Sequence, residues 1–173
     1  MAGLAGVEAL DLSGVTNVTH FWATTERTIL KVIGTGIVPP DGASVYARVS
    51  IDGSTFLATG IYDRAGKRWT SATTTSNLGG GVIGQMLLFG GAGGAAGEAM
   101  GFELTIVNIQ GSNWKGWESN AAGDASSGFS QGEIKGGDIR TTSELLGIQI
   151  LNSLGTNFTA GDVWVYELQD PTA

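Results

Sequence analysis

The chain has no cysteine and a single histidine, His20, among its 173 residues. Without cysteine it can form no disulfide, thiolate nucleophile, iron–sulfur cluster or cysteine-based zinc site, and nothing points to an oxidising compartment. One histidine cannot build a histidine metal site, and no motif places the partners of a catalytic triad around it. We therefore identify no catalytic residue and no metal ligand, and we expect His20 to be a surface or hydrogen-bonded histidine of a sheet.

Basic side chains and long apolar runs are also scarce. Nine lysines and arginines stand against sixteen aspartates and glutamates, a formal net charge of −7. This balance opposes nucleic acid as a partner, because that affinity comes from cations that neutralise phosphates. No uncharged apolar run approaches the roughly 20 residues of a membrane helix, and the segment 1–12 contains Glu8 and Asp11 and lacks the basic start of a secretion signal. We expect neither a nucleic-acid partner nor insertion into a membrane.

Glycine, by contrast, is abundant: the chain has 29 glycines, more than twice the usual share of ~7%. Hydrophobic residues make up 42% of the chain, which is too many for a disordered sequence. They alternate with a period of two in short runs between glycine-rich turns, and no segment keeps a helical period. The pattern predicts a single all-β domain over 1–173, with a lead-in segment at 1–13. We expect an antiparallel, jelly-roll-like β-sandwich of about eight or more strands and almost no helix.

The clearest alternation in the N-terminal half lies at 44–51, where apolar residues share one face of a strand. Asp52-Gly53 follows and is a strong signal for a turn between two paired strands. We therefore predict a return strand over Thr55–Tyr62. The charged segment Asp63–Arg68 is then predicted to be a solvated loop.

The most ordered pattern is at the C-terminal end, where two alternating runs, 146–151 and 163–168, are separated by turn-forming residues. They predict a hairpin of two paired strands. In the second run we place Trp164 and Tyr166 on the buried face, since aromatic residues favour a packed sheet surface.

The segment 90–101 is rich in glycine and alanine and follows an apolar run, Val82–Phe89, that we predict to be one buried strand. Residues 91–96 match the relaxed dinucleotide fingerprint GxGxxA. That fingerprint requires a long helix directly after it, and the alternating run 102–109 leaves no room for one. We therefore predict no cofactor, and a loop that is mobile in isolation and ordered only against a neighbour.

A long region at 110–138, rich in Gly, Ser and Asn, contains Trp114, Trp117 and Phe129 in polar surroundings. We predict exposed loops here, with strand pairing near 113–119 and 128–135. A segment so rich in Gly, Ser and Asn cannot be buried without leaving backbone N–H and C=O groups that lack a hydrogen-bond partner. Trp114 and Trp117 are three residues apart and so face opposite sides of an extended segment. These three aromatic residues are the candidate contacts for a ligand or partner; the alternative is that they fill the core or a subunit interface.

Several phrases of the chain together resemble a known family. They are GVT at 14–16 ahead of a strand, IVPPDG at 37–42, VYARVSIDGS at 45–54 ahead of Gly60 and Tyr62, and NFTAGDVWVY at 157–166. This order of phrases, over most of residues 14–168, is similar to that of small β-sandwich virion proteins of tailed bacteriophages. Two features depart from that family's pattern: the glycine-rich loop at 90–97, and Glu167 after the closing Tyr166, where glycine is usual.

The resemblance implies a structural protein on the surface of a phage particle, assembled in the host cytoplasm and located in the virion as a capsid decoration, head spike or tail-fibre domain. Its implied partners are itself, as a homotrimer, and other virion proteins, with attachment to a host-surface glycan as a further role. The residues single out no carboxylate pair for catalysis, so we expect no enzyme. The alternative function is a non-catalytic carbohydrate-binding module that uses exposed tryptophans.

Overall fold

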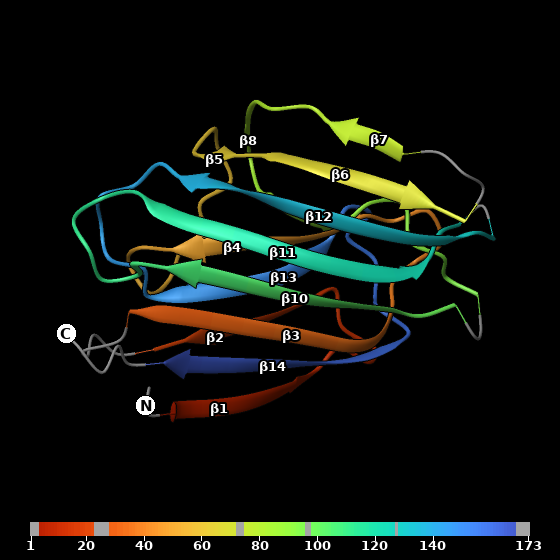
Figure 1. The fold of residues 1–173 in the computed structure, drawn as a ribbon. Coiled ribbons are helices and arrows are strands. Elements are labelled where there is room, and N and C mark those ends of the chain that lie inside the picture. The colour runs from red at the N-terminus through yellow and green to blue at the C-terminus, as the bar shows by residue number, and fades with distance from the viewer. Residues whose placement is uncertain (1–3, 23–27, 72–74, 96–97, 127, 169–173) are drawn as a thin grey trace.

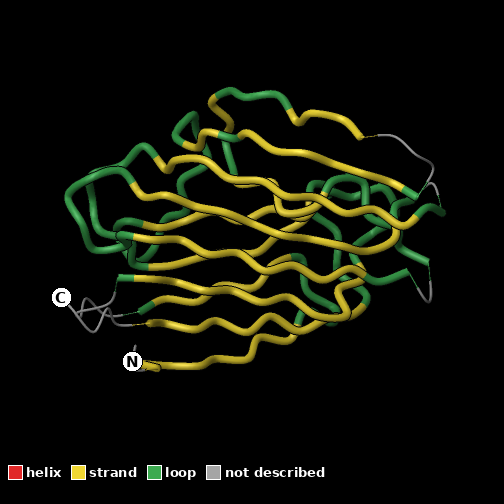
Figure 2. The backbone as a smooth tube through the Cα atoms, in the orientation of Figure 1, coloured by secondary structure: helices red, strands yellow, loops and turns green. Residues whose placement is uncertain are grey.

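The computed structural model describes residues 4–22, 28–71, 75–95, 98–126 and 128–168. These residues form fourteen β-strands and no helix, so they contain no helix that could cross a membrane. The strands make two antiparallel sheets, one of ten strands and one of four, that lie face to face (Figures 1 and 2). The all-β antiparallel sandwich predicted from the sequence is confirmed.

The larger sheet has the order β1-β14-β3-β10-β11-β12-β5-β8, with β6 also beside β12 and β7 beside β6. The bounds of its strands are β1 (Leu4–Asp11), β3 (Ile29–Val38), β5 (Tyr62–Asp63), β6 (Ala65–Thr70), β7 (Thr75–Leu78), β8 (Val82–Ile83), β10 (Met100–Val107), β11 (Lys115–Asp124), β12 (Ser130–Ile139) and β14 (Ala160–Leu168). The smaller sheet has the order β2-β13-β4-β9. Its strands are β2 (Asn17–Phe21), β4 (Val45–Ser50), β9 (Met86–Phe89) and β13 (Gly147–Asn152).

The hydrophobic core lies between the two sheets and follows the alternation of the sequence. In β4 the side chains of Val45, Ala47 and Val49 are fully buried, as predicted. In β10 the inward residues are Phe102 and Leu104 together with Ile106, while the residues between them face outward. Burial of one apolar face per strand against the opposite sheet is the main source of stability in such a sandwich.

The predicted C-terminal hairpin is wrong. β13 pairs with β2 and β4 in the smaller sheet, whereas β14 pairs with β1 and β3 in the larger one, so the two strands belong to opposite sheets. The burial of β14 is also the reverse of the prediction: Val163 and Val165 point inward, and Trp164 is 38% exposed. β14 has apolar residues on both faces, so its alternation alone does not fix which face is buried, and a one-residue shift exchanges them.

The predicted return strand over Thr55–Tyr62 is also wrong. After the turn at Asp52 the chain makes one bridge, Ser50 with Phe56, and then crosses to the larger sheet, where β5 begins at Tyr62. The Tyr62 hydroxyl holds the crossing in place, because it accepts a hydrogen bond from the Val49 amide and donates one to the Leu57 carbonyl, both at 3.0 Å. The segment predicted as a charged loop, Asp63–Arg68, belongs mostly to strands β5 and β6.

The apolar run Val82–Phe89 is two strands rather than one. β8 lies in the larger sheet and β9 in the smaller sheet, and the chain changes sheets at Gly84 and Gln85. The loop after β9 is hydrogen-bonded to other segments of the chain: the Ala92 amide donates to the Ala43 carbonyl at 2.8 Å, and the Gly93 amide to the Asp124 carbonyl at 2.7 Å. Its mobility in isolation stays a prediction. Residues 96–97 of the predicted mobile loop lie outside the described residues.

The region 110–138, predicted as loops, contains two central strands of ten residues each. β11 and β12 pair with each other from Lys115 and Ile139 at one end to Asp124 and Ser130 at the other. The strand pairing predicted near 113–119 and 128–135 is therefore confirmed, and the exposed loop is corrected to a pair of strands.

Candidate functional site

His20 links the two sheets at one edge of the sandwich. Its Nδ1 atom forms an ion pair with Glu8 on β1, and its Nε2 atom lies 2.8 Å from Oε1 of Glu167 on β14. The described residues contain no group of three side chains suited to a metal ion. The prediction of a hydrogen-bonded sheet histidine is confirmed, and its role here is to join strands.

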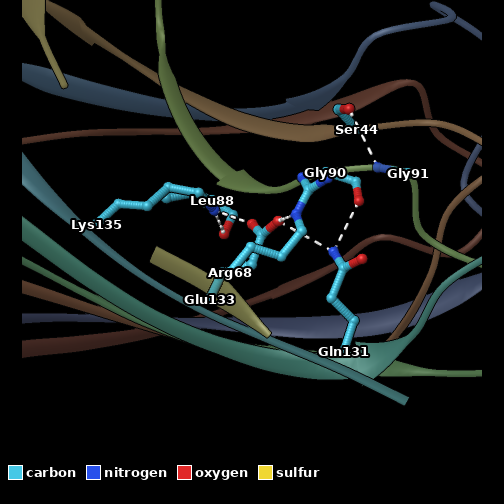
Figure 3. Close-up of polar contacts among 8 residues, drawn as sticks. All are labelled: Ser44, Arg68, Leu88, Gly90, Gly91, Gln131, Glu133 and Lys135. Atoms are coloured by element: carbon cyan, nitrogen blue, oxygen red, sulfur yellow. Dashed lines mark hydrogen bonds and ion pairs between the residues drawn. The ribbon is translucent and has the colours of Figure 1, made fainter. Parts of the chain in front are cut away.

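A cluster of charged side chains lies beneath the β6–β12 part of the larger sheet, between the two sheets (Figure 3). Glu133 is 1% exposed and forms ion pairs with Arg68 of β6 and with Lys135, its second neighbour along β12. Lys135 also donates to the Leu88 carbonyl at 2.7 Å, and Gln131 donates to the Gly90 carbonyl at 2.8 Å. The cluster therefore ties β12 and β6 to the end of β9 in the opposite sheet.

The glycine that follows β9 lets the Arg68 side chain of this cluster pack against the backbone. A Cβ atom at Gly90 would overlap the Arg68 guanidinium, which packs directly against the backbone there. Removing a charge from water is costly unless it is paired and hydrogen-bonded, and here each charge has such partners. The glycine-rich segment thus serves a packing role that its composition alone did not indicate.

Burial lowers the pKa of Lys135 to about 8, although the charge of Glu133 opposes this shift. The folded protein therefore gives up the Lys135 proton at a lower pH than the unfolded chain, whose lysines titrate near ~10.4. Burial raises the pKa of Tyr62 to about 12, so the folded state keeps that proton longer than an ordinary tyrosine near ~10.

We expect the free energy of unfolding to rise by up to about 2 kcal/mol between pH 8 and 10, because the unfolded state binds more protons there. Above pH 10 it should fall again as tyrosine in the unfolded chain ionises. Denaturant titrations at intervals of half a pH unit measure this. Lys135→Met should reduce the rise, leaving the smaller part due to Lys115, whose pKa burial also lowers; Lys31→Met, at a half-exposed site, should leave it intact. A flat profile between pH 8 and 10 in the parent contradicts the burial of a charged Lys135.

On the outer face of the larger sheet, above this cluster, side chains lie in rows that cross the strands. The strand register places three small residues and a tryptophan in one row: Gly101 of β10, Ala122 of β11, Gly132 of β12 and Trp69 of β6. The adjacent row contains Glu103, Asn120, Ile134 and Lys67. In the first row three residues have no side chain or a single methyl group, and the fourth is an aromatic residue at the end of the row.

Trp69 is 44% exposed, yet its ring is held in place. A Cβ atom at Gly132 would overlap the indole atoms Cε2, Cζ2 and Nε1, so the ring lies across the bare backbone of Gly132. Hollows of about 450 and 500 Å³ lie on either side of the ring. The first is lined by Ala122, Asn120 and Ile134, and the second by polar residues that include Asp124 and Ser130.

The three predicted contact residues are not brought together. Trp117 is 4% exposed in the core, where its Nε1 donates to the Asp63 carbonyl at 3.0 Å. Trp114 is 51% exposed, with the Arg140 guanidinium carbon 5.4 Å from its ring centre. Phe129 is exposed, but it precedes β12 whereas Trp114 precedes β11, so the antiparallel pair separates them by about 30 Å.

Sequence reasoning missed Trp69 because its surroundings are assembled from distant segments. The alternation of Lys67 and Trp69 on one face of β6 was the available signal, but the charges around it indicated a loop. That Trp69 lies over Gly132 depends on the pairing of β6 with β12, more than sixty positions later.

No protein-family model matches the chain, and no curated protein matches it. Among solved structures, a fructofuranosidase from Schwanniomyces occidentalis complexed with fructosylnystose is similar with a TM-score of 0.30 and 8% sequence identity. That similarity covers 98% of this chain and 34% of the other, so the chain spans about a third of its length. At this TM-score the similarity carries no argument.

Proposed function

We propose that this protein is a structural component of the surface of a tailed-phage particle, acting by assembly with itself and with other virion proteins. The observation that carries the proposal is the resemblance of its phrases to those of small virion sandwiches. Two of the phrases correspond to defined junctions of the fold: SIDGS to the turn that leaves β4, and NFTAG to the passage into β14.

The local chemistry of these junctions supports the proposal. Asp52 accepts hydrogen bonds from the amides of Ser54 and Thr55 at 2.8 and 2.7 Å, which hold the pKa of its carboxyl well below the usual range. Phe158 of the second phrase is 1% exposed and packs in the core. Both phrases thus have structural roles, as expected for residues that define a scaffold rather than a catalytic centre.

A separate exposed area suits assembly. The register places Val7, Ile33, Trp164 and Tyr166 side by side on the outer face of β1, β14 and β3. Val7 is 52% exposed and Trp164 is 38% exposed. Exposed aromatic and aliphatic side chains grouped in this way are typical of contacts between proteins, and the homotrimer of the proposal would use such a surface.

Quantitative mass spectrometry of purified particles from the phage that encodes the chain tests this role. We expect the protein to remain with the particles through a density gradient, at a fixed ratio to the major capsid protein. A ratio of hundreds per particle indicates capsid decoration, and a few or a dozen copies, in multiples of three, indicate a tail or vertex position. A host cytosolic protein of similar abundance serves as the contamination control. If the protein is removed from the particle fractions of the gradient to the same extent as that control, the proposal is refuted.

A carbohydrate-binding module is the second candidate function. Trp114, Trp117 and Phe129 do not form its site, since Trp117 is buried and the other two lie at opposite ends of β11 and β12. The observation that favours this candidate is the exposed, fixed ring of Trp69 beside two hollows.

A further inference from the structure

We propose that the row Gly101, Ala122, Gly132 and Trp69, with the hollows beside it, is a binding site for a neutral oligosaccharide. We call these four residues and their flanking hollows the Trp69 trough. The inference deepens the second candidate function and does not depend on the first, because the trough would bind the same ligand whether or not the protein belongs to a virion.

The shape of the trough fits a flat, narrow chain. It crosses four adjacent strands, so it is about 15 Å long at the usual spacing between strands. At Gly101 and Ala122 its floor is backbone and one methyl group, so a ligand can approach the sheet closely there; at Gly132 the Trp69 ring covers the backbone and offers its own face instead. The Trp69 ring, already resting on Gly132, loses little conformational freedom when a ligand stacks on it.

The chemistry of the trough fits a sugar. A hexose ring has a face of C–H groups and an edge of hydroxyl groups, so it needs an apolar surface with donors and acceptors beside it. Trp69 and Ile134 supply the apolar surface. The Asn120 amide can both donate and accept, and Ser130 and Asp124 line the hollow on the other side of the ring.

The charges around the trough select a neutral ligand. The acidic side chains of Glu103, Glu118 and Asp124 surround it, and among the residues lining its hollows and the adjoining one the exposed cation is Lys67. With the chain at a formal charge of −7 as well, sulfated, sialylated or phosphorylated glycans would be repelled. A peptide added as an extra strand is disfavoured too, because β11 and β12 are paired on both sides and offer no free backbone.

Rigidity comes from the charge cluster beneath. Glu133 and Lys135 alternate along β12 with Gly132 and Ile134 of the trough, so the strand is held by ion pairs on its inner face, while on its outer face Gly132 supports the Trp69 ring and Ile134 is exposed. The pairing of Glu133 with Arg68 fixes β6, which carries Trp69. The ring and the floor are therefore held in register before any ligand arrives.

The test is titration calorimetry of the full chain with cellohexaose, maltohexaose, laminarihexaose and mannohexaose, and with a heparin hexasaccharide as the acidic comparison. We expect at least one neutral hexasaccharide to bind with a Kd between ~10 μM and ~1 mM and the heparin hexasaccharide to show no binding. Trp69→Ala should weaken that binding at least tenfold. Asn120→Ala should weaken it severalfold, and Trp114→Ala, an exposed tryptophan outside the trough, should leave it unchanged.

Ala122→Tyr provides a second variant in case Trp69→Ala does not fold. Ala122 is exposed, so a tyrosine there fills the trough while Trp69 stays in place, and binding should be lost with the melting temperature preserved. The proposal is overturned if none of the four neutral hexasaccharides binds, if heparin binds more tightly than they do, or if binding survives Ala122→Tyr. Absence of the protein from phage particles would leave these measurements, and the trough, unaffected.

Discussion

Glu133→Ala is expected to lower the free energy of unfolding by about 3–5 kcal/mol at pH 7, because it removes the carboxylate that pairs with both the buried Lys135 and Arg68. Lys135 is 1% exposed and, within the part of the chain that the structure describes, would keep the Leu88 carbonyl as its acceptor, and Arg68 would lose its carboxylate. Urea denaturation followed by tryptophan fluorescence measures the change.

Glu103→Ala is the matched control for this change. Glu103 forms an ion pair with Lys31 at 2.9 Å on the outer face of the sheet, where both side chains are substantially exposed. Exposed pairs contribute at most about 1 kcal/mol. The double variant Glu133→Leu with Lys135→Met should be less destabilised than Glu133→Ala, since it removes both charges. If Glu133→Ala and Glu103→Ala unfold alike, the cluster is hydrated and does not hold the sheets together.

Trp117→Ala is expected to cost about 3–5 kcal/mol, the usual range for deleting a large core aromatic side chain. The change would open a cavity under β11 and would leave the Asp63 carbonyl without the indole donor. Trp114→Ala should cost less than about 1 kcal/mol, because that side chain is 51% exposed and its ring lies against the Arg140 guanidinium at the surface. Thermal and urea melts of the two variants in parallel compare them directly.

Trp117→Phe separates the two contributions at this position. It keeps most of the packing and removes the indole N–H, so we expect an intermediate loss of about 1–2 kcal/mol. Equal stability of the Trp117→Ala and Trp114→Ala variants would mean that the face of β11 assigned to the core is the wrong one.

The fold class and several strands could be predicted from the sequence where one face is apolar and the other polar. β4 and β10 are of this kind, and in each the apolar face of the alternation is the buried one. The buried face of β14 could not be assigned in this way, because both of its faces carry residues that are common in a core: Val163 and Val165 on one, Trp164 and Tyr166 on the other. Its orientation depends on tertiary partners, among them the ion pair of Glu167 with His20.

β11 and β12 could not be recognised in full because several of their inward residues are polar. Lys115, Gln131, Glu133 and Lys135 are all buried, the reverse of the rule that polar side chains face water. Each is satisfied by a partner from elsewhere in the chain or by a nearby backbone carbonyl, which local sequence does not reveal. The prediction that Trp114 and Trp117 face opposite sides depended only on their separation of three residues along an extended segment. The structure agrees with it, because Trp117 is buried and Trp114 is exposed.

The pairing of β14 with both β1 and β3 has a consequence for how quickly the protein folds. Leu10 lies opposite Val163, so this edge of the larger sheet cannot close until nearly the whole chain is available. Closing such long loops before any contact compensates for the lost entropy is slow, and folding in milliseconds to seconds is expected for β proteins of high contact order. Until β14 docks, β3 presents an unpaired strand edge, and this partly folded species is the form of the chain most open to pairing with another copy.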